Sequence, residues 1–285
     1  MQKIQWYPGH IAKAERKLSE IINRVDLVIE VRDARIPLST GHKHLNKWIK
    51  DKKHILVLNR ADMISPNSIT NWTKWFEHKN SFPLWCNAKE GDGIKEIYKA
   101  AKESSKSIDI RRLSRGMKKR PIRALTLGFP NVGKSALINR IANKKIVESA
   151  RKAGVTKNLR WIRLANGIDL LDAPGVIPPD LEDQKSAINL AICNDIGEAS
   201  YDIENIAREF IRILSKLHTN RNANISLNKI SLRYGINIQK GFKNPDEWFK
   251  IASEKHTSGD RRRMAYKLIE DYRNQMLGNI SLEIP

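Results

Sequence analysis

The sequence predicts an α/β fold, in which a mostly parallel sheet is covered by helices on both faces, followed by a smaller all-helical region. Three observations support this prediction. Apolar runs typical of strands alternate with helical segments up to about residue 180, as in βαβ units. A glycine-rich loop at 128–135 joins one such strand to a helix. Beyond about Ser186, apolar residues recur only at helical spacing.

The first half of the chain alternates regularly between the two kinds of element. A helix over roughly residues 10–23 precedes an apolar run at 25–31, which we interpret as a strand. Further elements are expected as a helix near 42–50, a strand at 54–58, a helix near 66–79, a strand at 82–86 and a helix from 93 to about 104. Residues 105–121 are basic, serine-rich and without clear period, so we expect a linker there.

The second half contains the glycine-rich loop and the helical region. A strand at 123–127 enters the loop, a helix at 134–142 leaves it, and two strands at 161–164 and 168–171 follow. Helical spacing then appears in two apolar sets: Ile203, Ile206, Ala207, Phe210, Ile211 and Leu214, and later Met264, Leu268, Ile269 and Tyr272. The sequence therefore predicts one domain over residues 1–185 and a helical domain over residues 186–285.

The charge of the chain indicates a polyanionic partner. The formal net charge is +21, whereas solubility needs a net charge of only ~2–8. Nine Lys and Arg lie within residues 102–123 against two acids, and eight lie within residues 140–163 against one. Such clusters favour nucleic acid by counterion release. No apolar run is long enough to span a bilayer, and no signal peptide or membrane association is expected. Cys86 and Cys193 show no metal spacing, which suits a reducing compartment.

The glycine-rich loop runs Gly128-Phe-Pro-Asn-Val-Gly133-Lys134-Ser135 and has the pattern of a phosphate-binding loop (P-loop). Its two glycines allow backbone N–H groups to turn inward around phosphate oxygens. Lys134 would neutralise the β- and γ-phosphates, and the Ser135 hydroxyl would ligate Mg²⁺. The predicted nucleotide contacts of this loop are Asn131, Val132, Gly133, Lys134, Ser135 and Ala136.

A second phosphate-sensing loop follows the P-loop. Asp172-Ala-Pro-Gly175 ends an apolar strand, where an acidic residue is costly unless it serves a cation. We expect Asp172 to hold Mg²⁺ through water and the Gly175 N–H to contact the γ-phosphate. Thr156 lies between the two loops and is the candidate for a threonine that closes over Mg²⁺.

Two strand ends earlier in the chain carry residues suited to a purine base. Asn59-Arg60-Ala61-Asp62 follows the strand that ends at Leu58, and Asn87-Ala88 ends the next strand. The Asp62 carboxylate can accept two hydrogen bonds from guanine, a donor pair that adenine lacks. The Ala88 N–H could meet the guanine oxygen. Arg60 replaces the usual lysine, and its planar guanidinium could stack on the base.

With these residues in place, the chain resembles the circularly permuted GTPases of the ribosome biogenesis GTPase A (YlqF) family. The resemblance covers residues 1 to about 180 and includes the segments Trp6–His10 and Asp33–Pro37. The helical region matches mainly in its ending, Leu277–Glu283. The resemblance implies a cytoplasmic GTPase that binds GTP or GDP with Mg²⁺, contacts rRNA in a precursor of the large ribosomal subunit, and is a monomer off the ribosome. Asn131 is similar to a loop asparagine that helps to hold K⁺ in related potassium-stimulated GTPases.

The order of the motifs predicts a circularly permuted P-loop NTPase with three layers. The base-reading segment lies before the P-loop, where an ordinary GTPase has it last. The helix over 10–23 and the strand at 25–31 then correspond to elements that usually follow the second phosphate loop, so the cut falls just after Gly175. The helical domain is attached directly to that sensor, and the nucleotide state could reorient the domain by ordering one loop.

The residue that positions the attacking water is not in its ordinary place. GTPases usually carry a glutamine soon after the second phosphate loop, but Val176 stands here and cannot polarise water. His10, at the start of the helix beside that loop, is the candidate catalytic residue, and the family is similar in using this histidine. The alternative is a histidine that caps the helix or contacts RNA.

Three functions are compatible with these patterns. The first is a GTPase that uses hydrolysis to time its release from a precursor of the large (50S) subunit. The second is a nucleotide-gated RNA-binding scaffold with incidental hydrolysis, a hypothesis that Val176 favours. The third is a GTPase that acts on another RNA.

Overall fold

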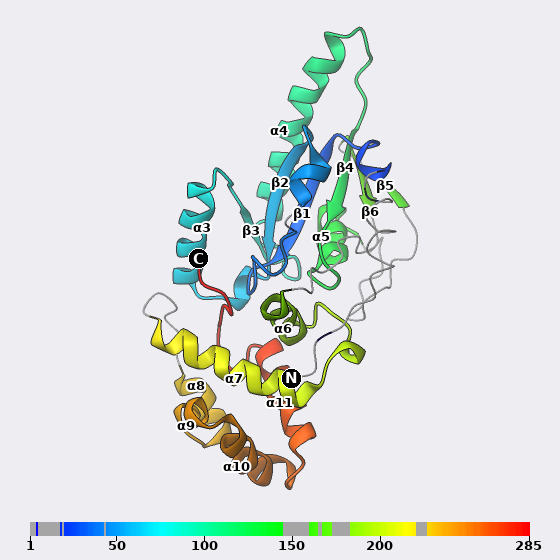
Figure 1. Cartoon of the computed structure of the whole chain (residues 1–285). Helices are drawn as coiled ribbons and strands as arrows, with labels where there is room; N and C mark the ends of the chain where they lie inside the picture. The colour runs from blue at the N-terminus through cyan, green and yellow to red at the C-terminus, as the bar shows by residue number, and fades with distance from the viewer. Residues whose placement is uncertain are drawn as a thin grey trace.

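The computed structural model describes residues 4, 18, 20–42, 44–144, 160–164, 167–172, 183–220 and 227–285 (Figure 1). Its single sheet has the strand order β3-β2-β1-β4-β6-β5. The strands are β1 (Leu27–Asp33), β2 (Lys53–Asn59), β3 (Leu84–Cys86), β4 (Ile122–Leu127), β5 (Arg160–Leu164) and β6 (Ile168–Asp172). All neighbouring pairs are parallel except β5 and β6, which are antiparallel. The predicted, mostly parallel sheet is confirmed.

The permuted order is visible in the middle of the sheet. β1 pairs with β4, so that Leu27 lies opposite Ala124, although the two strands are far apart in sequence. β1 is buried along nearly its whole length, as expected for a strand covered on both faces. Because parallel strands end at the same edge, the carboxyl ends of β1, β2, β4 and β6 lie side by side. That edge carries the strand ends at which the phosphate-binding and base-reading motifs lie.

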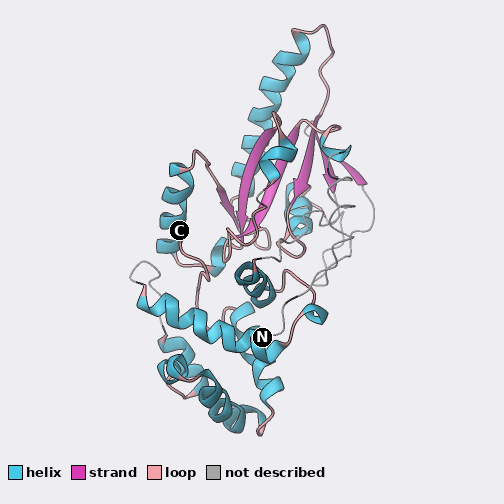
Figure 2. Cartoon of the chain, in the orientation of Figure 1, coloured by secondary structure: helices cyan, strands magenta, loops and turns pink. Residues whose placement is uncertain are grey.

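Helices cover both faces of the sheet, which gives the three layers (Figure 2). The helices of this part are α2 (Leu45–Ile49), α3 (Pro66–His78), α4 (Ile94–Leu113) and α5 (Lys134–Ile141). In β2, Leu56 packs with Trp72 of α3 in one apolar cluster, whereas Val57 and Ile97 of α4 belong to the other. Successive strand residues point to opposite faces, so α3 and α4 lie on opposite sides of the sheet.

The expected linker over 105–121 is partly wrong, because α4 continues to Leu113 instead of ending near Ser104. The serines explain the difference. The hydroxyls of Ser104, Ser105 and Ser107 donate to carbonyl oxygens of the preceding helical turn at 2.9–3.0 Å, so these side chains are accommodated inside a helix. Ile108 is buried and continues the helical spacing of Ile97 and Ala101. Only residues 114–121 connect α4 to β4 without regular structure.

The helical region begins with α6, whose first residue is Gln184. Its helices are α6 (Gln184–Cys193), α7 (Ile203–Thr219), α8 (Asn228–Tyr234), α9 (Ile238–Lys243), α10 (Pro245–Thr257) and α11 (Arg261–Arg273). α7 buries the predicted apolar stripe from Ile203 to Leu214. The core of this region is continuous with that of the sheet. Among the described residues, no helix is both long and apolar enough to cross a bilayer.

Candidate nucleotide site

The P-loop has the shape that its glycines predict. It connects β4 to α5, and Gly133 stands at the N-cap of α5 with φ of 101°. Gly128 has φ of 155°, and a Cβ placed there would lie 2.3 Å from the Val31 oxygen. Only glycine fits such a close approach between two backbones. The first N–H groups of α5, including those of Ser135 and Ala136, have no partner within the helix and form an anion-binding end.

Lys134 is held by the loop that it belongs to. Its Nζ donates to the backbone oxygens of Gly128 at 3.0 Å and Phe129 at 2.6 Å, and the residue is buried. The ammonium therefore lies inside the curve of the loop, where a phosphate chain would meet both the positive charge and the inward N–H groups.

Asn59 joins the P-loop to the two base-reading segments. Its Nδ2 donates to the Val132 oxygen at 2.8 Å, and its Oδ1 accepts from the Ala88 N–H at 3.0 Å. A Cβ on Gly133 would lie 2.1 Å from the same Nδ2. The structure thus brings the predicted phosphate end and base end together at one sheet edge. The Ala88 N–H, expected to face the guanine oxygen, is already bonded to Asn59.

Asn87 shapes the second base-reading segment. Its Oδ1 accepts from the N–H groups of Lys89 at 3.0 Å and Glu90 at 3.2 Å, which closes a tight turn. Arg140 of α5 donates from Nε to the Ala88 oxygen at 3.2 Å. The helix that follows the P-loop therefore stabilises this turn through the Arg140 side chain.

Arg60 is held by protein partners in this structure. It adopts a left-handed backbone conformation, with φ of 64°. Its guanidinium donates to the Asp33 carboxylate and, at 2.6 Å, to the Asn131 oxygen of the P-loop. These bonds hold the guanidinium between a buried carboxylate and the P-loop, and stacking of Arg60 on a base stays a prediction. The neighbouring Asp62 side chain is exposed, and Ala61 between them is half-buried.

Beneath Arg60 lies a buried charge cluster that the sequence motifs did not assign. Asp33 accepts from Arg35 Nε at 3.0 Å and from Arg35 Nη2 at 2.7 Å. Burial by itself would raise the pKa of the Asp33 carboxyl, but the charges of Arg35 and Arg60 outweigh it and lower the pKa to about 2. Asp33 is the last residue of the buried strand β1, so its position at a strand end was the available signal.

Asp195, just after α6, is the second acid of this cluster. Within the part of the chain that the structure describes, neither of its carboxylate oxygens has a hydrogen-bond partner. Arg60 Nη1 lies 3.7 Å from its Oδ1. Burial, and then repulsion from Asp33, raises the pKa of Asp195 to about 7. Nothing in the local sequence marks this residue, because only the docking of α6 places it beside Arg60.

α6 also contacts the P-loop directly. Asn131, which has φ of 61°, donates from Nδ2 to the Asn194 oxygen at 2.7 Å. Arg35 Nη2 donates to the Cys193 oxygen at 3.2 Å. The end of α6 is therefore fastened to the loop that holds Lys134. This bond uses the Asn131 nitrogen, whereas K⁺ would be held by the side-chain oxygen, and that role stays a prediction.

Several predicted site residues lie outside the described residues: His10, Thr156, Gly175 and Val176. Of Asp172 the backbone is described, and it ends β6 opposite Thr126 of β4. The end of β6 thus lies beside the strand that enters the P-loop, as the predicted Mg²⁺ site requires. Among the described residues no group of three His, Cys, Asp or Glu forms a metal site.

Comparison with known proteins places these features in context. A family model described as "50S ribosome-binding GTPase" matches residues 123–229. "Ribosome biogenesis GTPase A" of Bacillus pumilus is 36% identical over 218 residues, which cover 76% of this chain and 77% of that protein. The protein of the same name from Bacillus cereus is 38% identical over 218 residues, or 76% and 74% of the two chains.

Solved structures show the same fold. A GNP-bound YlqF from T. maritima matches with a TM-score of 0.63 and 21% identity, over 96% of this chain and 98% of that chain. A GDP-bound YlqF matches with a TM-score of 0.66 and 21% identity, over 95% and 99% of the two chains. The permuted sheet and the helical region are therefore shared as one arrangement.

Proposed function

The chain belongs to the ribosome biogenesis GTPase A family, and from this premise we propose that it assists assembly of the large (50S) ribosomal subunit, binding rRNA with GTP and leaving after hydrolysis. Its activity as a GTPase follows from the family and the GTPase domain. The observation that supports the proposed site best is the double hydrogen bond of Asn59 to the P-loop and to the Ala88 segment.

Within this proposal each end of the site binds one part of the nucleotide. The P-loop residues 131–136 hold the phosphates through Lys134 and the N-terminal end of α5. Asp62 reads the guanine edge, with Asn59 and the segment 87–88 forming the rest of the base pocket. Arg60 donates to the Asn131 oxygen of the P-loop, and its planar guanidinium would stack on the base.

The residues proposed for Mg²⁺ offer a suitable donor set. Ser135 and Thr156 supply hydroxyl oxygens and Asp172 a carboxylate, and oxygen ligands are those that Mg²⁺ prefers. The ion would neutralise charge between the β- and γ-phosphates. Gly175 would contact the γ-phosphate, and His10 would orient water in place of the glutamine that Val176 replaces. K⁺ near Asn131 would add a further positive charge.

For rRNA the structure offers a projecting basic arm, which we define as residues 102–121. Figure 1 shows the end of α4 and the following loop extending beyond the sheet. Arg120 ties the base of the arm to Asp26 at 2.8–2.9 Å, and Arg112 donates to the Lys118 oxygen across the turn that follows α4. Its exposed cations are Lys102, Lys106, Arg111, Arg115, Lys118 and Lys119. Such a surface suits the shape and phosphates of folded RNA.

Sedimentation of cell extract with GDP, GTP or a non-hydrolysable GTP analogue tests the proposal. We expect the protein on 50S precursor particles with GTP or the analogue and free, as a cytoplasmic monomer, with GDP. Turnover measured with and without particles separates a timed GTPase from a scaffold with incidental hydrolysis. A protein that sediments identically in all three nucleotides would contradict the proposal.

A further inference from the structure

The end of the chain returns to the base-reading loop. After α11 the backbone turns sharply, with Gln275 at φ of 60° and Gly278 at φ of 97°. Leu277, Ile280 and Leu282 are then buried, so this segment is packed against the body of the protein rather than lying on its surface. We name residues 275–283 the C-terminal clip. It includes Leu277–Glu283, the part of the helical region that resembles the family in sequence.

The clip holds the backbone of Asp62 with two side chains. Gln275 Nε2 donates to the Asp62 oxygen at 2.8 Å, and Asn279 Nδ2 donates to the same oxygen at 2.9 Å. A carbonyl oxygen has two lone pairs, so the two amides fill its capacity. They restrain the peptide plane that follows the Asp62 side chain.

Asp62 needs such restraint because its own loop is weak. It lies in the three-residue 3₁₀ turn η1 (Ala61–Met63), in which the Met63 N–H bonds the Arg60 oxygen at 3.0 Å and the Ile64 N–H bonds the Ala61 oxygen at 3.4 Å. Hydrogen bonds in 3₁₀ turns have poor geometry. Contacts from outside the turn therefore determine where the carboxylate points.

The rest of the clip forms hydrogen bonds with the loop that precedes α2. The Leu282 N–H donates to the Arg35 oxygen at 2.9 Å, and the Glu283 carboxylate accepts from the N–H groups of Leu38 at 2.7 Å and Ser39 at 3.0 Å. Arg35 in turn binds Asp33, which holds the Arg60 guanidinium. The clip thus contacts the base-reading loop directly at Asp62 and is linked to Arg60 through Arg35 and Asp33.

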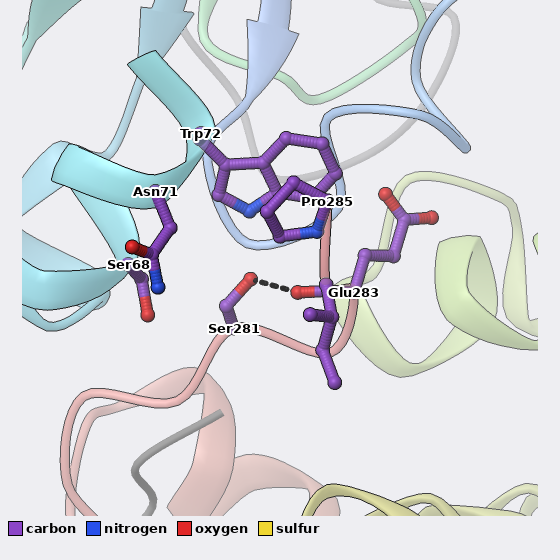
Figure 3. Close-up of a pocket in the computed structure, with 7 residues that line it drawn as sticks. Ser68, Asn71, Trp72, Ser281, Glu283 and Pro285 are labelled. Carbon is purple, nitrogen blue, oxygen red and sulfur yellow. Dashed lines mark hydrogen bonds between the residues drawn. The ribbon is translucent and has the colours of Figure 1, made fainter. Parts of the chain in front are cut away.

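Figure 3 shows how the end of the clip is seated. Ser281 donates to the Glu283 backbone oxygen at 2.8 Å, and a small pocket lies between this turn and Trp72 of α3. Trp72 packs with Leu56 and Leu58 of β2, so the clip lies beside the helix that covers the strand leading into the base-reading loop. The clip therefore lies against the nucleotide-binding domain, although in sequence it is the end of the helical domain.

We propose that the C-terminal clip is a positioning element of the guanine site, which holds Asp62 in the orientation that reads the base. The inference rests on the proposed role of Asp62. It implies a reciprocal coupling: guanine binding at Asp62 strengthens docking of the clip, and docking of the clip strengthens guanine binding. The position of the helical domain would then be coupled to binding of the guanine base as well as to binding of the phosphates.

The test compares the Gln275→Ala/Asn279→Ala variant with Asn274→Ala, which removes an exposed amide one residue away. Dissociation constants are measured for GDP and for inosine diphosphate, which lacks the 2-amino group that would donate a hydrogen bond to Asp62. In the double variant we expect GDP to bind about 5- to 10-fold more weakly, inosine diphosphate to be affected less, and the preference for GDP to fall. Wild-type affinities and preference in the double variant would overturn the inference.

An Asp62→Asn variant separates failure of the clip from failure of the site. An asparagine amide would oppose the guanine donors and match the second carbonyl oxygen of xanthine, so we expect its preference to move from GDP to xanthosine diphosphate. If Asp62→Asn keeps its preference for GDP, the assignment of Asp62 fails and the clip inference with it. If Asp62→Asn changes preference but the double variant equals wild type, only the clip inference fails.

Hydrogen exchange provides a readout that does not depend on affinity. GDP should slow exchange in a peptide covering residues 276–285 of the wild-type protein, and this protection should be lost in the double variant. Should the double variant not fold, Asn279→Ala alone is measured. We expect its loss of GDP affinity, on a logarithmic scale, to be about half of that predicted for the double variant. Equal exchange of the peptide with and without GDP would count against the inference.

Discussion

The side-chain amide of Asn59 donates a 2.8 Å hydrogen bond to the main-chain oxygen of Val132, across 73 residues of sequence. The same side chain accepts from the Ala88 N–H. One buried asparagine therefore determines how far the P-loop lies from both base-reading segments. The two motifs are connected in the opposite order in a permuted chain, and this bond holds them together at one edge of the sheet.

Replacement of Asn59 by alanine should separate the two ends of the site. The change leaves the Val132 oxygen and the Ala88 N–H without their buried partner, at a cost of about 1–3 kcal/mol in the free energy of unfolding. We expect GDP affinity to fall at least about tenfold, as measured by calorimetry. Asn67→Ala, an exposed asparagine on α3, is the matched control. Wild-type GDP affinity in Asn59→Ala would contradict the role of Asn59 in holding the two ends of the site together.

Asp195 should make stability depend on pH. Its folded pKa is raised from 3.8 to about 7, so the folded state keeps a proton that the unfolded state loses. Stability arising from this proton is present at acidic pH and is lost as pH rises toward and through 7. Asp195→Asn keeps the shape without the charge. As pH rises from 5 to 8, we expect the free energy of unfolding of Asp195→Asn to increase relative to that of the wild type by on the order of 1–3 kcal/mol.

Urea unfolding of both proteins at several pH values measures this difference. Asp202→Asn serves as the control, because Asp202 caps α7 outside the charge cluster. The prediction fails if the stability difference between Asp195→Asn and wild type is the same at pH 5 and pH 8.

His10→Ala should spare nucleotide binding and lower turnover. If His10 orients the attacking water, its loss should reduce GTP hydrolysis on 50S precursor particles by about 10²-fold, with little change in the affinity for GDP. His78→Ala, an exposed histidine at the end of α3, is the control. Equal turnover by His10→Ala and wild type in the presence of particles would refute the catalytic role.

Charge reversal in the basic arm should weaken RNA binding and its dependence on salt. For Lys118→Glu/Lys119→Glu, we expect the slope of log affinity against log salt to become shallower by about 1.5, because two phosphate contacts are removed. Lys47→Glu/Lys74→Glu makes the same change of charge at exposed lysines outside the arm. If both variants show the same slope, the arm is not the preferred RNA surface.

Much of the fold could be predicted because its signals are local. The apolar run that became β1, the glycines of the P-loop and the stripe of α7 each act within one element. The end of α4 was missed for a local reason as well: serine is typical of linkers, yet Ser104, Ser105 and Ser107 bond back to their own helix.

The sequence by itself determined which loops carry the chemistry, since a phosphate loop needs Gly128, Gly133 and Lys134 at set spacing whatever surrounds them. Tertiary structure decided what those loops contact. Asp195 comes to lie beside Arg60, and Gln275 and Asn279 meet on one oxygen of Asp62. Such contacts join segments distant in sequence, and their energy depends on burial and geometry that exist only after the helical region has packed against the sheet.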